Sequence, residues 1–254
     1  TAERDAEVEV IFSNGVDVVT KIVTGTGATP VDVTLEATDL ALLGEGAISV
    51  TANVTDIAGN VDTQILNFTL DTTAPTAPIV ELMFDTGTNT SDGITSDATV
   101  KVTAELGASV LVTFTNTDTN QVVTMTVAGN GVLPVPAALS SDQLSLLGDG
   151  AISVIATATD VAGNVSDPSI KLDFIRDTTP PATPVLALVS DTGLSASDHI
   201  THDATVQVTA ELDSNVVVTF NNGTNTVSKT VVGAGVTPVV IALNATELAL
   251  LGNG

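Results

Sequence analysis

The stretch Leu-Leu-Gly-Asp-Gly-Ala-Ile-Ser-Val at residues 146–154 decides the fold, because the chain carries it more than once. It occurs as Leu-Leu-Gly-Glu-Gly-Ala-Ile-Ser-Val at 42–50, and Leu-Leu-Gly-Asn-Gly ends the chain at 250–254. Each copy begins 104 residues after the one before it, at 42, 146 and 250. A repeat of this length matches one small domain, so we expect a tandem array rather than a single large fold.

Two further blocks repeat and mark where one unit passes into the next. Asp-Ile-Ala-Gly-Asn at 56–60 matches Asp-Val-Ala-Gly-Asn at 160–164, and Asp-Thr-Thr-Ala-Pro at 71–75 matches Asp-Thr-Thr-Pro-Pro at 177–181. Proline fixes φ and has no N–H, so the proline clusters predict short, stiff linkers. The sequence therefore predicts a partial module at 1–73 that lacks its first strands, a complete module at 74–179, and a partial module at 180–254 that lacks its last strands.

Alternating apolar and polar residues between turn residues predict seven strands in the complete repeat. These are 79–84, 98–106, 109–115, 122–127, 132–138, 151–159 and 169–175, with one short helix at 141–147. Seven strands in about 104 residues are typical of an immunoglobulin-like β-sandwich. The predicted fold class is all-β, with tandem immunoglobulin-like modules in an extended array. Exposed sheet edges in the partial modules would invite strand exchange or homotypic contact between chains.

Composition excludes several classes of partner. The chain has 254 residues, 30 Asp and Glu against 6 Lys and Arg, and a formal net charge of −24. Nucleic acid is neutralised by clustered basic residues, which this chain lacks, so we expect no nucleic-acid partner. No apolar run is long enough to span a bilayer, so no direct membrane insertion is expected. With no cysteine, disulfides and zinc-thiolate sites are excluded, and the 43% hydrophobic content favours a folded chain.

The carboxylates gather in the predicted loops, while the strands are nearly uncharged. Because antiparallel strands alternate in direction, the 85–97 and 149 loops should lie near the outgoing linker, and the 160–164 loop near the incoming one. Crowded carboxylates favour a bridging cation, and calcium accepts several carboxylate, carbonyl and water oxygens in tolerant geometry. The alternative is that Asp, Asn, Gly, Ser and Thr serve these loops as ordinary turn residues. His199 and His202 align with Gly93 and Ser96 of the complete repeat, so no role common to all modules depends on them.

These blocks together resemble the tandem bacterial immunoglobulin-like extender repeats of giant RTX adhesins. The resemblance covers the whole chain and implies calcium at the module junctions, type I secretion, and an extracellular, cell-surface location on an outer-membrane-anchored parent protein. Neighbouring repeats of the same chain and calcium ions would be the partners. The metal ligands that it implies are Asp56, Asp71, Asp85, Asp92, Asp97, Asp149, Asp160, Asp177, Asp191, Asp198 and Asp203. Glu45 and Asn253 replace Asp149 in the flanking copies.

The expected function is therefore mechanical: a calcium-rigidified rod that projects a distal ligand-binding region away from the cell. The alternative is an adhesive module that itself binds a glycan, a host receptor or a like module on another cell. The chain has no Trp or Tyr to form a sugar-binding platform. An enzyme is not expected, because the two histidines belong to one repeat only and the carboxylates follow the repeat pattern.

Overall fold

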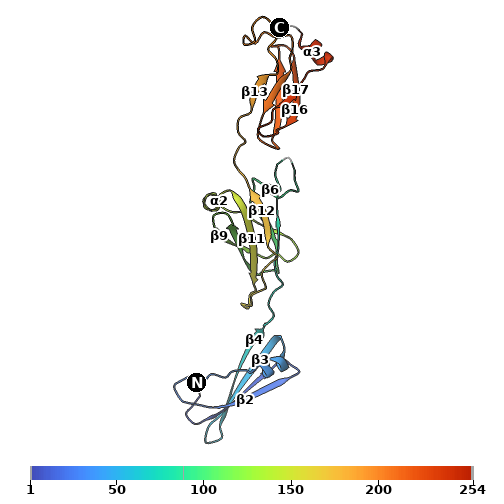
Figure 1. The fold of residues 1–254 in the computed structure, drawn as a ribbon. Helices are drawn as coiled ribbons and strands as arrows, with labels where there is room; N and C mark the ends of the chain where they lie inside the picture. Colours follow the sequence, from blue (N-terminus) through green and yellow to red (C-terminus); the bar gives the residue numbers. More distant parts are fainter. Residues whose placement is uncertain (1, 88, 253–254) are drawn as a thin grey trace.

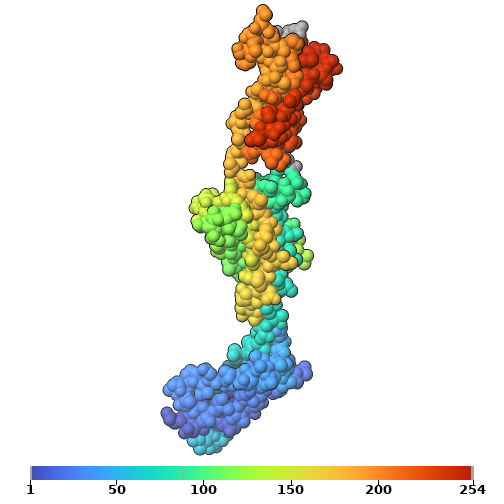
Figure 2. Space-filling view, in the orientation of Figure 1, coloured from blue at the N-terminus to red at the C-terminus, as the bar shows by residue number. Residues whose placement is uncertain are grey.

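The computed structural model describes residues 2–87 and 89–252. Figure 1 shows three groups of strands that follow one another along the chain and are joined by two extended linkers. Figure 2 shows the same elongated outline, with the groups in sequence order from one end to the other. We call them the first, second and third groups, and the linkers are residues 71–78 and 177–184. Within the described part of the chain, the helices are too short to cross a membrane.

The second group is a sandwich of two sheets. One sheet has three strands in the order β10-β7-β5, and the other has five in the order β6-β12-β11-β8-β9. All pairs are antiparallel except β6 with β12, which is parallel. The elements are β5 (Ile79–Leu82), β6 (Ile94–Thr95), β7 (Val100–Thr103), β8 (Ser109–Asn116), β9 (Gln121–Ala128), β10 (Val135–Ala137), α2 (Ser141–Leu147), β11 (Gly150–Thr159) and β12 (Leu172–Arg176).

The core of the second group follows from the alternation of side chains along its strands. In β8, Val110, Val112 and Phe114 are fully buried, while the residues between them point outward or are only partly covered. Val154 on the neighbouring strand β11 is equally buried and belongs to the same cluster. Branched aliphatic side chains thus fill most of this core, together with two phenylalanines, Phe114 and Phe174.

Every strand predicted for the complete repeat is present, and the all-β, immunoglobulin-like fold class is confirmed. Four strands, β5, β7, β10 and β12, are shorter than predicted, and β6 was not predicted. The last strand begins at Leu172 instead of residue 169, because the carbonyls of the segment before it do not accept from the N–H groups of Ala156 and Ala158 on β11. The hydroxyls of Ser166 and Ser169 accept hydrogen bonds from the β11 backbone N–H groups of Ala158 and Ala156 instead, at 2.9 and 3.0 Å.

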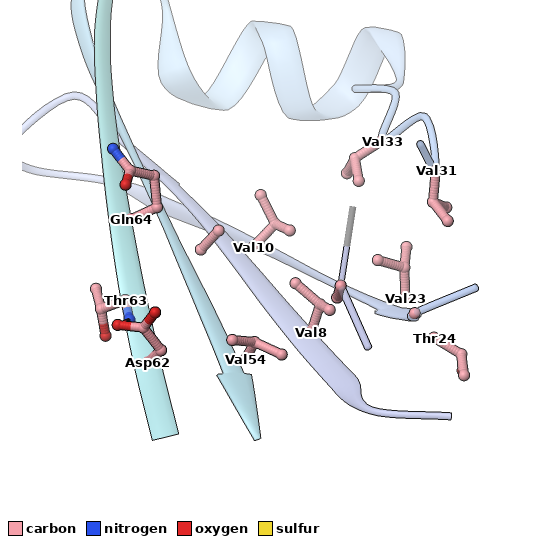
Figure 3. A pocket seen from close by; sticks show the side chains of 13 residues that line it. Val8, Val10, Val23, Thr24, Val31, Val33, Val54, Asp62, Thr63 and Gln64 are labelled. Atoms are coloured by element: carbon pink, nitrogen blue, oxygen red, sulfur yellow. Dashed lines mark hydrogen bonds between the residues drawn. The ribbon is translucent and has the colours of Figure 1, made fainter. Parts of the chain in front are cut away.

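The first group is a single four-stranded sheet in the order β2-β1-β3-β4 with one short helix. Its inner face is only partly covered, and Figure 3 shows the resulting pocket, about 400 Å³ in volume and lined by valines of the sheet and of the 31–33 segment. Phe68 on β4 is 38% exposed, whereas the equivalent Phe174 in the second group is 5% exposed. The elements are β1 (Glu7–Ser13), β2 (Val18–Thr24), α1 (Ala37–Leu43), β3 (Gly46–Thr55) and β4 (Val61–Leu70).

The third group repeats the first part of the second. A three-stranded sheet in the order β13-β14-β17 packs against the two-stranded sheet β15-β16 around Val208, Val218 and Ile241. The elements are β13 (Val185–Leu188), β14 (Val206–Thr209), β15 (Asn215–Asn221), β16 (Thr226–Val232), β17 (Val239–Ile241) and α3 (Ala245–Leu251).

Candidate functional site: the linkers and the loops beside them

In the first and second groups, the residue after the helix and its C-cap glycine contacts the outgoing linker. In the second group, Ser140 caps α2 in a capping box with Gln143, and the helix ends at Gly148 with φ 72°. Gly150 opens β11 with φ 125°. These left-handed conformations favour glycine on both sides of Asp149, which is thereby turned out of the helix and towards the linker.

Asp149 holds the start of the second linker. Its carboxylate accepts hydrogen bonds from the Thr178 N–H at 3.1 Å, from the Thr178 hydroxyl at 2.8 Å and from the Thr179 hydroxyl at 3.4 Å. It also pairs with the Arg176 guanidinium at 2.7 Å. Partial burial raises the pKa of Asp149, but the bonds from Thr178, Arg176 and Thr179 outweigh it, so its pKa is lowered. The Arg176 guanidinium thus already places a positive charge beside this carboxylate, as a bound metal ion would.

Glu45 holds the first linker in the same way, although its side chain is longer. Its Oε1 accepts from the Thr72 N–H at 3.0 Å, the Thr72 hydroxyl at 2.8 Å and the Thr73 hydroxyl at 2.6 Å. The hydrogen bonds from Thr73 and then Thr72 lower the pKa of Glu45. The third copy carries Asn253 here, which lies outside the described residues.

Each linker is also contacted by the group that follows it. The Asn164 side-chain amide in the loop after β11 donates to the Asp71 carbonyl at 3.2 Å, which places that loop against the incoming linker. Ala182 of the second linker donates its N–H to the Glu211 carboxylate of the third group at 3.2 Å. Asp71 and Asp177 themselves accept from the N–H of Thr73 and Thr179 two residues later.

The long loop after β5 meets the start of the outgoing linker at residues 93–95, as strand direction predicts. The Asp177 N–H donates to the Thr95 carbonyl at 2.9 Å, and the Ile175 N–H donates to the Gly93 carbonyl at 2.8 Å. The Thr95 side chain is buried, and its hydroxyl joins the two ends of the loop through the carbonyls of Phe84 and Asp97. The same hydroxyl pattern recurs at Thr201 of the third group.

Asp85 and Asp191 occupy the same position in the two copies of this loop, and each has one unpaired oxygen. The Oδ2 atoms accept from the N–H of Gly93 at 3.0 Å and of His199 at 2.9 Å. The Oδ1 atoms of both residues are shielded from solvent and have no hydrogen-bond partner. An unsatisfied, shielded carboxylate oxygen is costly, and these two equivalent oxygens are free to accept a further bond from a water or a cation.

The other predicted ligands close tight turns through their own carboxylates. Asp56 and Asp160 accept from the backbone and side chain of Asn60 and Asn164, and these bonds, from the asparagine side chains first, lower both pKa values. Four loop carboxylates accept a backbone N–H two residues ahead: Asp92, Asp97, Asp198 and Asp203. Within residues 2–87 and 89–252, no three acidic or histidine side chains converge as a metal-binding group. Any ion here would therefore need backbone carbonyls and water as well.

Sequence reasoning missed an asparagine that supports the linker-holding residue. Asn116 at the end of β8 is fully buried; its side-chain amide donates to the carbonyls of Leu147 and Asp149, both at 2.9 Å. Its Oδ1 accepts the N–H groups of Asp118 and Thr119. Asn14 and Asn222 make the equivalent bonds to the last residues of α1 and α3. The recurring Phe-x-Asn at 12–14, 114–116 and 220–222 was the available signal.

His199 and His202 lie in the 191–203 loop of the third group. The His202 Nδ1 lies 2.7 Å from the Thr192 hydroxyl, where the second group has the Ser96 hydroxyl near that of Thr86 at 3.0 Å. The histidine thus replaces a serine in a hydroxyl network and holds the loop closed.

Comparison with known proteins gives structural neighbours only. No protein-family model and no curated protein matches the chain. The chain is similar to the extending repeats of large bacterial adhesins. It is 24% identical, with a TM-score of 0.35, to a tetra-tandem repeat from the extending region of a large adhesion protein, covering 96% of this chain and 60% of that one.

Two further neighbours come from ice-binding adhesins. One is from a 1.5-MDa bacterial ice-binding adhesin, with 20% identity, a TM-score of 0.36, and coverage of 96% of this chain and 77% of that one. The other is a Ca²⁺-stabilised adhesin of an Antarctic bacterium, with 23% identity, a TM-score of 0.33, and coverage of 98% and 60%. Identities and TM-scores this low transfer no function to this chain.

Proposed function

We propose that this chain is a spacer segment of a bacterial cell-surface adhesin, located outside the cell, whose immunoglobulin-like modules at 1–73, 74–179 and 180–254 hold a distal ligand-binding region away from the cell. The observation that carries the proposal is that each linker is hydrogen-bonded on both sides, through Glu45 and Asn164 at the first and Asp149 and Glu211 at the second. Linkers tied in this way transmit direction from one module to the next instead of acting as free hinges.

Calcium is the ion proposed to stiffen the array. The donor set beside the linkers consists of carboxylates, hydroxyls and carbonyls, which suits a hard cation that takes oxygen ligands. The shielded Oδ1 atoms of Asp85 and Asp191 are the strongest candidates for direct ligands, since each lacks a partner. Asp92, Asp97, Asp198 and Asp203 in the same loops, together with the linker residue Asp177, would contribute further oxygens.

The acidic charge also favours calcium. A net charge of −24 on 254 residues makes the modules repel one another, and bound divalent ions would reduce that repulsion. Sites of the extracellular class have Kd values of about 10⁻⁴–10⁻³ M, so they would fill outside the cell and stay largely empty in a cytosol. The chain would then be stiffest outside the cell, where a spacer is useful.

Calcium titration followed by amide NMR signals tests the ion assignment, because Gly93 and His199 donate directly to Asp85 and Asp191. We expect both amide signals to shift and to saturate with Kd values of about 10⁻⁴–10⁻³ M. Asp85→Asn should abolish the Gly93 response and leave that of His199, and Asp191→Asn should do the reverse. Asp167→Asn, at an exposed carboxylate of the second group, is the matched control. Signals that stay fixed at millimolar calcium would overturn the assignment.

A further inference from the structure

The acidic residue between two glycines after α1 and after α2 has a role that needs no ion. Glu45 and Asp149 differ in length, yet both carboxylates accept from the N–H and the hydroxyl of the first linker threonine and from the hydroxyl of the second. Three hydrogen bonds from two successive residues fix the direction in which the chain leaves its sheet. Charge-assisted hydrogen bonds of this kind are roughly twice as strong as neutral ones.

From this geometry we propose that Glu45 and Asp149 are linker clamps, which hold the threonines of the outgoing linker and set the orientation of the next module without any bound metal. This inference rests on the proposed spacer function and assigns separate roles to two sets of carboxylates. The clamp fixes the start of the linker, and the Asp85 and Asp191 loops respond to calcium.

The parts around the clamp are built to hold it in place. The buried Asn116 binds the carbonyl of Asp149 itself, so the residue is fixed through its backbone as well as its side chain. Asn14 binds the Leu43 carbonyl at 2.7 Å, two residues before Glu45. A side chain whose own backbone is tied down loses little entropy when it accepts the linker bonds.

The two clamps are of unequal strength. Arg176 pairs with Asp149 and its side chain is only 12% exposed, whereas the first group has Leu70 at the equivalent place. The first clamp therefore depends on Thr72 and Thr73 alone. We therefore expect that weakening the clamp loosens the first linker more than the second.

Spin-label distance measurements across each linker test the clamp directly. The chain has no native cysteine, so labels can be placed at exposed positions: Val18 and Val132 span the first linker, and Val132 and Val236 the second. In chelator, Glu45→Ala should lower the ratio of held to released first linker about tenfold and broaden its distance distribution. The second linker should be unchanged in the same variant.

Two further variants separate the loss of the clamp hydrogen bonds from the loss of a negative charge. Replacing both Thr72 and Thr73 with valine keeps every carboxylate and should broaden the first-linker distribution as Glu45→Ala does. Asp32→Ala removes an equally exposed charge from the same group and should change nothing. At the second linker, Asp149→Asn should broaden the distribution more than Arg176→Leu.

The clamp is overturned if Glu45→Ala and the double valine variant both keep the wild-type distribution in chelator, or if Asp32→Ala broadens it equally. The calcium part of the spacer proposal fails separately, if the wild-type distributions and overall dimensions are the same with calcium and with chelator.

Discussion

Replacing Asn116 with alanine should destabilise the second group more than alanine at the equivalent Asn14 and Asn222 destabilises the first and third groups. The Asn116 side chain makes four hydrogen bonds from a fully buried position, to two carbonyls and two N–H groups. A net hydrogen bond contributes about 1 kcal/mol, and a buried group left unpaired costs about 1–3 kcal/mol. Water can reach the two N–H groups in the exposed turn, so we expect a loss of about 2–3 kcal/mol, mainly from the two carbonyls.

The equivalent asparagines provide a graded series within one molecule. Asn14 is partly buried and binds one helix carbonyl, so Asn14→Ala should cost about 1–2 kcal/mol. Asn222 is exposed, so Asn222→Ala should cost about 1 kcal/mol or less. Burial, rather than the number of bonds, orders these three values.

Urea unfolding followed through amide NMR signals of each group is the suitable assay, because a single melting temperature does not describe several cooperative units. The midpoint shift multiplied by the denaturant slope gives the loss for each group. Equal losses at the three positions, or a larger loss at Asn222 than at Asn116, would refute the argument from burial.

Three more predictions follow from the packing and from the acidic clamps. Phe114→Ala should destabilise the second group by about 3–5 kcal/mol, whereas Phe68→Ala at a 38% exposed position should cost about 1 kcal/mol, as urea unfolding would measure. Ser169→Ala should cost about 1–3 kcal/mol by leaving the Ala156 N–H unpaired, and faster hydrogen exchange at that amide would show it. The pKa of Glu45 is lowered, so its contribution to holding the linker is fully present above its ordinary pKa of 4.5 and is lost as the pH falls through the folded pKa. When the pH is varied, spin-label distances across the first linker should therefore broaden only in acid. Glu45→Ala should remove this pH dependence.

The repeat and the strand pattern could be predicted because both are written in local sequence. A period of two in Val110, Val112 and Phe114 gives the inward face of β8 directly, and the helix at Ser141–Leu147 is marked by its capping residues. Strand β6 could not be predicted, since it consists of two loop residues that pair with β12, a strand far away in the sequence.

The candidate site was predictable in outline but not in detail. Alternating strand direction places the 85–97 loop and Asp149 at the outgoing linker, and the structure shows both there. Whether a loop aspartate keeps one unpaired oxygen, as Asp85 does, or uses both to close its own turn, as Asp160 does, depends on backbone geometry that composition does not specify. The role of Asn116 depends on a contact between residues 31 positions apart, which only the fold brings together.

Small-angle scattering of the chain in millimolar calcium and then in excess chelator tests the central claim most directly. We expect a long, sharply defined maximum dimension with calcium, in keeping with the elongated outline in Figure 2, and a broader distribution of dimensions once the ion is removed and the clamps alone hold the linkers. Identical scattering profiles in the two conditions would contradict it, and would leave the acidic loops as turns alone.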